Sequence, residues 1–253
     1  AFTKGMDGMS MPVGSEEQVN LLYTDYATTY KKVNEKGITS LLRKVSDEEP
    51  DIIIAMLHWG SEHNDTVYDN QEDIVYIMQK AGVDVIINLT TSGGSNDDDL
   101  RVAHLKALRP EMCSYDAGSI NWANDGVFMN SPKFLMKLGQ VTMDYGVKPE
   151  IEVFDSHMIK AAVRFYERGF LEGPLHFQLV MGTYGGMDGT VDNLLFLRNQ
   201  LPAGCTYSVT GIGSASVPML MAALAMGADG IRVGLEDNLY MAKGEFATNV
   251  SQV

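Results

Sequence analysis

The sequence predicts an α/β protein of the TIM (β/α)8 barrel class, in which helices enclose a ring of parallel strands. Short apolar runs alternate with amphipathic stretches from about residue 19 onward. Eight such repeats in 253 residues suit a barrel better than an open α/β sheet, which is the alternative. A hydrophobic content of 45% with 21% charged residues is ordinary for a globular domain.

Eight segments have the length and apolar content of buried strands. They are 19–24, 51–59, 84–90, 112–118, 150–155, 177–182, 206–211 and 230–235. The stretches between them carry apolar residues at i, i+3, i+4 spacing, and several end at glycine, as helices do. Examples are 70–82, 131–146, 157–170 and 216–227. We therefore expect one barrel domain over residues 1–253, with an irregular leader at 1–18.

Composition excludes several classes of function. A net charge of −14 argues against a general nucleic-acid surface, because phosphate binding needs clustered Lys and Arg. No apolar run approaches the roughly 18 residues of a membrane span, and no signal-peptide pattern precedes the domain, so we expect a cytoplasmic protein. Cys113 and Cys205 lack the spacing of a metal site or a disulfide framework and are expected to be buried thiols.

The period of two along a strand predicts which side chains enter the barrel. If Ile151 and Val153 face the helices, Glu150 and Glu152 point inward. In a TIM barrel, functional residues gather at the carboxyl ends of the strands. The polar residues that the sequence places there are His58, Thr91, Ser92, Ser119, Glu152, Arg232, Glu236 and Asp237.

Six motifs follow one another in the order found in one protein family. They are INLTTSGGS, RPEMCSYDAGSINW, VKPEIEVFD, LVMGTYGG, VTGIG and RVGLEDNLYMAKG. From about residue 81 to the end, the chain resembles the beta-keto acid cleavage enzyme family, typified by 3-keto-5-aminohexanoate cleavage enzyme. The resemblance implies a zinc-dependent TIM barrel that condenses a β-keto acid with acetyl-CoA and yields acetoacetate and a new CoA ester. It also implies a homo-oligomer, since the family tends towards tetramers.

The resemblance assigns roles to individual residues. It implies that zinc is held by two histidines ending the second strand and by Glu236. The neighbouring Asp237 would be the general base, coupled to Arg232 and Glu152. A further set of hydroxyl groups would bind the substrate and its carboxylate: Thr91, Ser92 and, in the fourth-strand loop, Ser119.

The first third of the chain departs from the family pattern. Where the family reads HLHARD this chain reads MLHWGS, so Met56 replaces the first histidine and His58 alone remains. A catalytic zinc usually has three protein ligands, and the third would be His63 or a water. Residues 19–87 also resemble CapA-type proteins of poly-γ-glutamate synthesis, which have a metallophosphoesterase-like fold. This resemblance suggests a barrel whose first two units differ in origin from residues 88–253.

Each of these features also has a plainer interpretation. His58 could be a hydrogen-bonded core histidine, and TTSGGS could be an ordinary glycine turn rather than a cradle for an anion. Arg232 is expected to pair with the carboxylates and keep them ionised, yet it could form a purely structural ion pair at the barrel bottom. Two alternative functions remain open. One is a folded but inactive barrel with an incomplete metal site, and the other is a CapA-like metal-dependent phosphoesterase.

Overall fold

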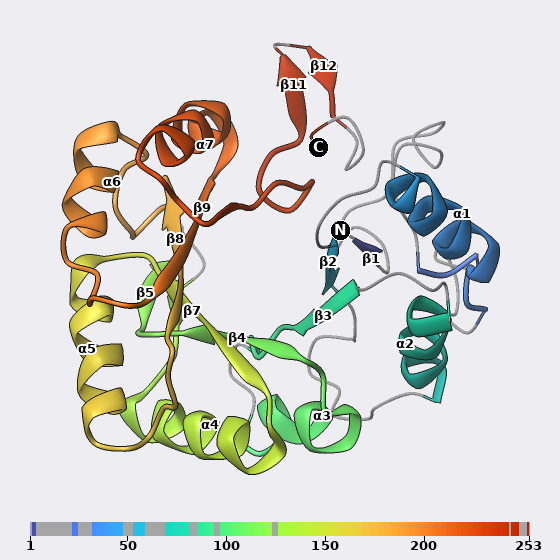
Figure 1. Ribbon diagram of the computed structural model, residues 1–253, viewed down its shortest axis with the longest axis horizontal. Coiled ribbons are helices and arrows are strands. Elements are labelled where there is room, and N and C mark those ends of the chain that lie inside the picture. Colours follow the sequence, from blue (N-terminus) through green and yellow to red (C-terminus); the bar gives the residue numbers. More distant parts are fainter. Residues whose placement is uncertain are drawn as a thin grey trace.

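Figure 1 shows the computed structural model of the protein. The structure describes residues 2–3, 22–24, 32–47, 53–58, 69–80, 85–93, 97–122, 126–242, 244–247 and 252. For the strands β1 (Phe2–Thr3) and β2 (Ile53–His58), it describes the backbone alone. His63 lies outside the described residues.

Eight strands form one sheet in which every neighbouring pair is parallel. Their order in the sheet is β1-β2-β3-β4-β7-β8-β9-β10. After β1 and β2 come β3 (Val85–Leu89), β4 (Met112–Asp116), β7 (Lys148–Val153), β8 (His176–Met181), β9 (Thr206–Gly211) and β10 (Gly230–Ile231). Two antiparallel hairpins lie outside this sheet: β5 (Ile120–Trp122) with β6 (Gly126–Phe128), and β11 (Tyr240–Ala242) with β12 (Glu245–Phe246).

The helices lie around the outside of the strands (Figure 1). They are α1 (Glu35–Ser46), α2 (Asp69–Lys80), α3 (Leu100–Leu108), α4 (Pro132–Tyr145), α5 (Ser156–Glu167), α6 (Val191–Arg198) and α7 (Ser216–Ala225), with the short 3₁₀ helix η2 (Gly213–Ala215) before α7. A parallel sheet enclosed by helices confirms the predicted TIM-barrel class. None of the described helices has the length and apolar composition that a membrane span requires.

The predicted first strand at 19–24 is wrong for its described residues. Tyr23 forms an isolated antiparallel bridge with Val33, and the edge of the sheet is instead β1, within the segment expected to be an irregular leader. The side chains of Leu22 and Tyr23 are buried, so this apolar run serves packing without entering the sheet. Among the described residues, β1 and β10 are the two edges of the sheet and are not paired with each other.

The last strand is shorter than predicted. It was expected at 230–235 but ends at Ile231, after which Arg232 N–H still donates to the carbonyl of Val209 at 2.9 Å. The carbonyl of Gly234 then accepts hydrogen bonds from the backbone N–H groups of Asp237 and Asn238, at 3.1 and 3.0 Å. The backbone therefore turns where an alternating strand pattern predicted extension.

Helix α4 illustrates how local sequence sets the elements. Ser131 caps its first turn by accepting from the N–H of Phe134 at 3.1 Å, and Pro132 occupies the first helical position. The helix ends at Gly146, whose φ of 69° is the left-handed conformation that glycine adopts without steric cost. Between these ends Gly139 faces the segment that follows α5, and a Cβ there would overlap the carbonyl oxygen of Phe170.

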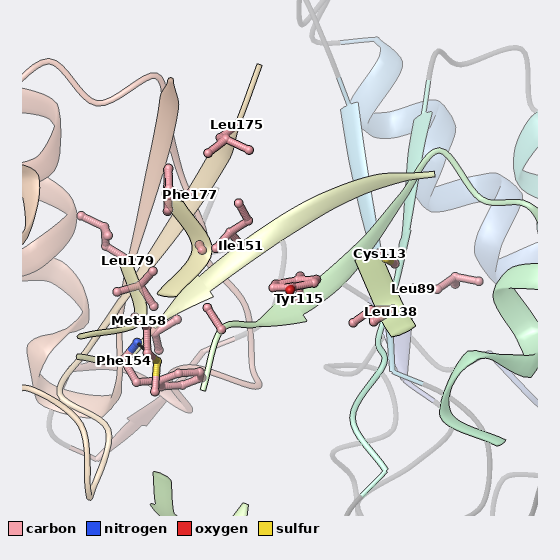
Figure 2. Close-up of a cluster of buried hydrophobic side chains, with 14 of the residues drawn as sticks. Leu89, Cys113, Tyr115, Leu138, Ile151, Phe154, Met158, Leu175, Phe177 and Leu179 are labelled. Atoms are coloured by element: carbon pink, nitrogen blue, oxygen red, sulfur yellow. Dashed lines mark hydrogen bonds between the residues drawn. The ribbon is translucent and has the colours of Figure 1, made fainter. Parts of the chain in front are cut away.

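The core lies between the outer face of the sheet and the helices. Figure 2 shows Tyr115 of β4, Ile151 of β7 and Phe177 of β8 among the side chains of this core, all of them fully buried. Met158 of α5 packs close to Phe154. Cys113 is a buried free thiol, as predicted, whereas Cys205 is a free thiol that is only half-buried. Burial of apolar surface stabilises a protein by about 25 cal/mol per Å2. The side chains on the outer face of the sheet therefore hold it against the helices.

We predict that Gly139→Ala destabilises the protein by about 1–3 kcal/mol, although alanine has the higher helix propensity. The reason is steric, because the added methyl group would overlap the backbone of Phe170. Urea unfolding monitored by circular dichroism measures the effect. Gln140→Ala, at an exposed position of the same helix, is the matched control and should leave stability nearly unchanged. A Gly139→Ala variant as stable as the wild type would show that α4 does not pack this closely.

Candidate functional site

The inner face of the sheet is polar. On β7, Ile151 and Val153 are fully buried in the core beneath the helices, as the alternation predicts. Glu150 and Glu152 occupy the alternate positions, and in register they lie opposite Ser114 and Asp116 of β4. The inner face therefore carries acids at neighbouring positions of adjacent strands.

One guanidinium, that of Arg232, gathers three carboxylates. Its Nε and Nη2 donate to Oδ2 and Oδ1 of Asp237 at 2.9 and 2.5 Å. Its Nη1 lies 3.8 Å from Glu152 Oε1, and its Nη2 lies 3.7 Å from Glu236 Oε2. Asp237 and Glu152 are buried, whereas the side chain of Glu236 is 58% exposed. The structure thus brings together four residues that the sequence analysis singled out.

The turn after β10 is what places Asp237 against Arg232. It folds the chain back over five residues, so that the acid meets the base in a bidentate ion pair. The backbone of the same turn is tied to the loop after β9, because Gly213 N–H donates to Asp237 O at 2.7 Å. Arg232 follows the carboxyl end of its strand, so the cluster does not close the barrel bottom. A structural ion pair at the top of the strands remains compatible with this geometry.

Burial and charge act in opposite directions on these groups. Burial lowers the pKa of Arg232, but the Asp237 hydrogen bonds and the charge of Glu152 outweigh it, so this pKa is raised well above its ordinary value. Burial, followed by the charge of Asp116, raises the pKa of Glu152 well above its usual range, and Arg232 opposes this only in part. Arg232 thus favours the ionised form of Glu152 but offsets only part of the rise in its pKa, and Glu152 retains its proton more readily than an exposed glutamate.

Two further buried acids on this face were not among the predicted site residues. Asp116 is 4% exposed, and its Oδ2 has no hydrogen-bond partner among the described residues. Burial raises the pKa of Asp116 to about 6, against the opposing charge of Arg101. Glu150 accepts a hydrogen bond from Asn88 Nδ2 at 2.5 Å, and burial raises its pKa too. The signal that could have found Asp116 was the alternation of β4, in which Cys113 and Tyr115 are the core positions.

The predicted substrate-binding residues lie in two neighbouring loops. Thr91, directly after β3, is fully buried, and its hydroxyl donates to the carbonyl of Ser114 at 2.9 Å. Because this proton is already donated to Ser114, the Thr91 hydroxyl can only accept a hydrogen bond from a ligand and cannot donate one. Ser92 is exposed, and its N–H donates to the hydroxyl of Thr90 at 3.1 Å. Ser119, after β4, accepts from the N–H of Asn130 at 2.8 Å.

Arg101 of α3 joins these two loops and was not predicted as a site residue. Its Nε donates to the Thr91 carbonyl at 2.9 Å and its Nη1 to the Met129 carbonyl at 2.9 Å. Its Nη2 donates to Asn130 Oδ1 at 2.5 Å. Burial lowers the pKa of Arg101, and the charge of Asp116 opposes that shift. No feature of the sequence distinguishes Arg101 from the arginines that lie on exposed helix faces.

The glycines after β8 and β9 are used for close packing within the protein. Gly182, at a φ of 85°, donates its N–H to the carbonyl of Met187 at 2.9 Å and closes the loop after β8. A Cβ on Gly189 would overlap the side chain of Ala215, in the loop after β9. These contacts favour tight turns over a bound phosphate as the reason for the glycines.

The described part of the chain contains no group of three or more His, Cys, Asp or Glu side chains that could hold a metal ion. Of the predicted zinc ligands, only the side chain of Glu236 is described, and it lies 3.7 Å from Arg232. His58 ends β2 with its backbone alone described, and Met56 is in register with Asn88. A catalytic zinc site usually has three protein ligands, and Glu236 is the one predicted ligand whose side chain the structure describes.

Comparison with known proteins shows which protein family this sequence matches. A model of the beta-keto acid cleavage enzyme family matches residues 38–253. A 3-keto-5-aminohexanoate cleavage enzyme from Fusobacterium nucleatum is 38% identical over 164 residues, which are 65% of this chain and 59% of that enzyme. A 3-dehydrocarnitine:acetyl-CoA trimethylamine transferase from Rhizobium meliloti is 32% identical over 206 residues, with 73% of this chain and 68% of that one covered.

A solved structure is similar in fold. The apo structure of ObcA superposes with a TM-score of 0.66 at 23% identity, over 81% of this chain and 55% of that chain. At this identity the similarity concerns the fold alone. The chain spans about three-fifths of the length of the Fusobacterium enzyme. The family match begins at residue 38 and so includes β2 and α2, in the segment for which the sequence analysis suggested a different origin.

We predict that Asp116→Asn stabilises the protein by about 2–3 kcal/mol above pH 6, because the variant no longer buries an unpaired carboxylate. The pKa of Asp116 is raised from 3.8 to about 6 by folding, so the native state binds this proton more tightly than the unfolded chain does. Wild-type stability should therefore fall as the pH rises from about 4 to about 6, and remain lower above that range.

Urea unfolding at pH 4.5 and pH 8 compares the two proteins, and the gain should be much smaller at the lower pH. Asp144→Asn, on the exposed end of α4, is the control and should shift stability little at either pH. A loss of stability in Asp116→Asn at pH 8 would contradict the prediction, because it would mean that the carboxylate is paired.

Proposed function

Because the chain belongs to the beta-keto acid cleavage enzyme family, we propose that it exchanges acyl groups between a β-keto acid and acetyl-CoA. The products are acetoacetate and the CoA ester of the remaining acyl group. The observation that carries the proposal is the cluster of Arg232, Asp237, Glu152 and Glu236 at the carboxyl ends of the strands, where TIM-barrel enzymes perform their chemistry. The names of the relatives, a keto acid cleavage enzyme and an acetyl-CoA-dependent transferase, support it.

In this proposal Asp237 is the general base. It takes a proton from the methylene carbon between the ketone and the carboxylate of the substrate, and the resulting carbanion attacks the acetyl thioester. Arg232 holds the carboxylate of Asp237 through two hydrogen bonds, which fixes its orientation towards the substrate. Glu152, which retains its proton readily, lies on the other side of the guanidinium and limits the negative charge of the cluster.

The thiolate of CoA that leaves the acetyl group then attacks the original ketone carbon of the substrate. The carbon–carbon bond next to it breaks, and the acyl group stays on CoA. The carbanion released takes back the proton held by Asp237 and becomes acetoacetate. Ser92 and Ser119 are proposed to bind the substrate carboxylate and the adjoining part of the keto acid. Thr91, whose proton is donated to Ser114, supports them from the buried side of the loop.

Zinc is part of the proposal, with His58, Glu236 and His63 as the ligands. A zinc ion supplies a Lewis acid that polarises the ketone and makes the adjacent methylene more acidic. Met56 favours the alternative of a folded barrel that binds zinc weakly and is therefore inactive. Assembly into tetramers, as in the family, is also proposed.

We predict that Asp237→Asn lowers kcat by about 10²–10⁴-fold, with a smaller effect on KM for acetyl-CoA, because the amide cannot accept the proton. The assay follows acetoacetate formation from acetyl-CoA and either 3-keto-5-aminohexanoate or 3-dehydrocarnitine, the compounds in the names of the two relatives. Asp192→Asn, on the exposed surface of α6, is the control and should retain full activity. If the wild type releases no acetoacetate from any β-keto acid, the proposed function is incorrect.

We predict that Met56→His raises the affinity for zinc by at least about 10-fold, because it restores the pair of histidines that the family pattern has at the end of the second strand and so adds a ligand to His58 and Glu236. Competition with a chromogenic chelator measures the affinity, and the acetoacetate assay shows whether activity rises with it. Met241→His, in the exposed hairpin of β11 and β12, controls for metal binding by any added histidine. Equal affinities in the wild type and in Met56→His would show that β2 does not direct this position towards the other ligands.

A further inference from the structure

We infer that Arg101 is a positioning residue that fixes the two substrate-binding loops, after β3 and after β4, relative to each other. The inference rests on the proposed function, because it takes Ser92 and Ser119 to be the groups that bind the keto acid carboxylate. Arg101 itself lies on α3, outside the cluster around Arg232, and it acts through backbone and amide oxygens.

The contacts of Arg101 reach both loops at once. On one side its Nε holds the carbonyl of Thr91, one residue before Ser92. On the other side its Nη2 holds Asn130 Oδ1 at 2.5 Å, and the N–H of Asn130 donates to the hydroxyl of Ser119 at 2.8 Å. Asn130 Nδ2 also donates to the carbonyl of Gly118 at 3.2 Å. Three hydrogen bonds therefore connect the Thr91–Ser92 peptide group to Ser119 through one guanidinium.

The peptide group between Thr91 and Ser92 is held at both ends. Its carbonyl accepts from Arg101 at 2.9 Å, and its N–H, which points the opposite way in a trans peptide, donates to the Thr90 hydroxyl at 3.1 Å. With both polar atoms bonded, the peptide plane has little freedom to rotate. The direction in which the exposed side chain of Ser92 leaves the loop is thereby set.

The guanidinium is rigid because it is buried and stacked. Arg101 is 5% exposed, and its Cζ lies 3.6 Å from the centre of the Phe134 ring on α4. The stem of the side chain passes directly behind Gly93, where an added Cβ would lie 2.6 Å from Arg101 Cγ. A side chain at residue 93 would displace the arginine, so the first glycine of the TTSGG motif is needed for this contact.

Arg101 has a second effect through its charge. A buried cation close behind the loop favours an anion in front of it, and in a medium of low dielectric constant this attraction is stronger than in water. The hydrogen-bonding geometry and the charge together select a carboxylate over a neutral group of the same shape. Substitution of a residue with only a structural role would not change this preference for a carboxylate over a neutral group.

The test compares two ligands that differ in charge: acetoacetate and its neutral methyl ester. Dissociation constants are measured by isothermal titration calorimetry for the full chain and for Arg101→Lys, which keeps the charge but cannot make three directed hydrogen bonds. We expect acetoacetate to bind about 10-fold more weakly to the variant while binding of the ester changes by less than about 2-fold. Asn130→Ala, which removes one acceptor of the guanidinium, should show the same selective loss and covers the case in which Arg101→Lys does not fold.

Arg168→Lys is the matched control, since Arg168 also stacks on an aromatic ring, Phe170, but at the far end of α5. It should bind both ligands as the wild type does. The inference is overturned if the wild type does not bind acetoacetate, if Arg101→Lys binds it with unchanged affinity, or if the variant loses affinity for both ligands equally. A selective loss of acetoacetate binding in a protein that forms no acetoacetate from acetyl-CoA would refute the proposed function alone.

Discussion

The structure depends on how one buried guanidinium balances a group of buried acids. Arg232 is held by both oxygens of Asp237 and lies within 4 Å of Glu152 and Glu236. Removing such charges from water is costly unless they are paired, and a single cation cannot neutralise three carboxylates. The chain meets this constraint in two ways, since Glu236 stays exposed and the raised pKa of Glu152 favours its protonated form.

The cost of burying charge also explains why the two faces of the sheet differ in polarity. The outer face is apolar and packs against the helices, so the hydrophobic effect holds the strands in place from that side alone. The inner face is left to polar groups whose positions are set by the backbone, as with Glu150, which accepts from Asn88. A sheet stabilised from outside can tolerate an inward group that costs stability, such as the buried Asp116 carboxylate.

Strand periodicity predicted most of the sheet because the central strands β3, β4, β7, β8 and β9 have a buried apolar face, and it also placed Ile151 and Glu152 on opposite sides. It failed at 22–24, the described part of the strand predicted at 19–24, where the buried Leu22 and Tyr23 are not in the sheet, and after Ile231, where a turn replaces the strand. The alternation of polar and apolar residues indicates which side chains are buried, but it does not show where the backbone turns. Arg101 could not be predicted, because its partners are carbonyl groups, which no residue type reveals.

The two buried arginines divide the site into regions of different charge. Around Arg232 the acids outnumber the cation, which suits the removal of a proton and repels an anionic substrate group. Around Arg101 the guanidinium is bonded to neutral oxygens, so its positive charge is not cancelled by direct contact with an acid. In the proposed function, this division of charge places the carboxylate of the β-keto acid at the Arg101 end and its methylene group towards Asp237. Asp116 interacts electrostatically with both arginines and so couples the two regions.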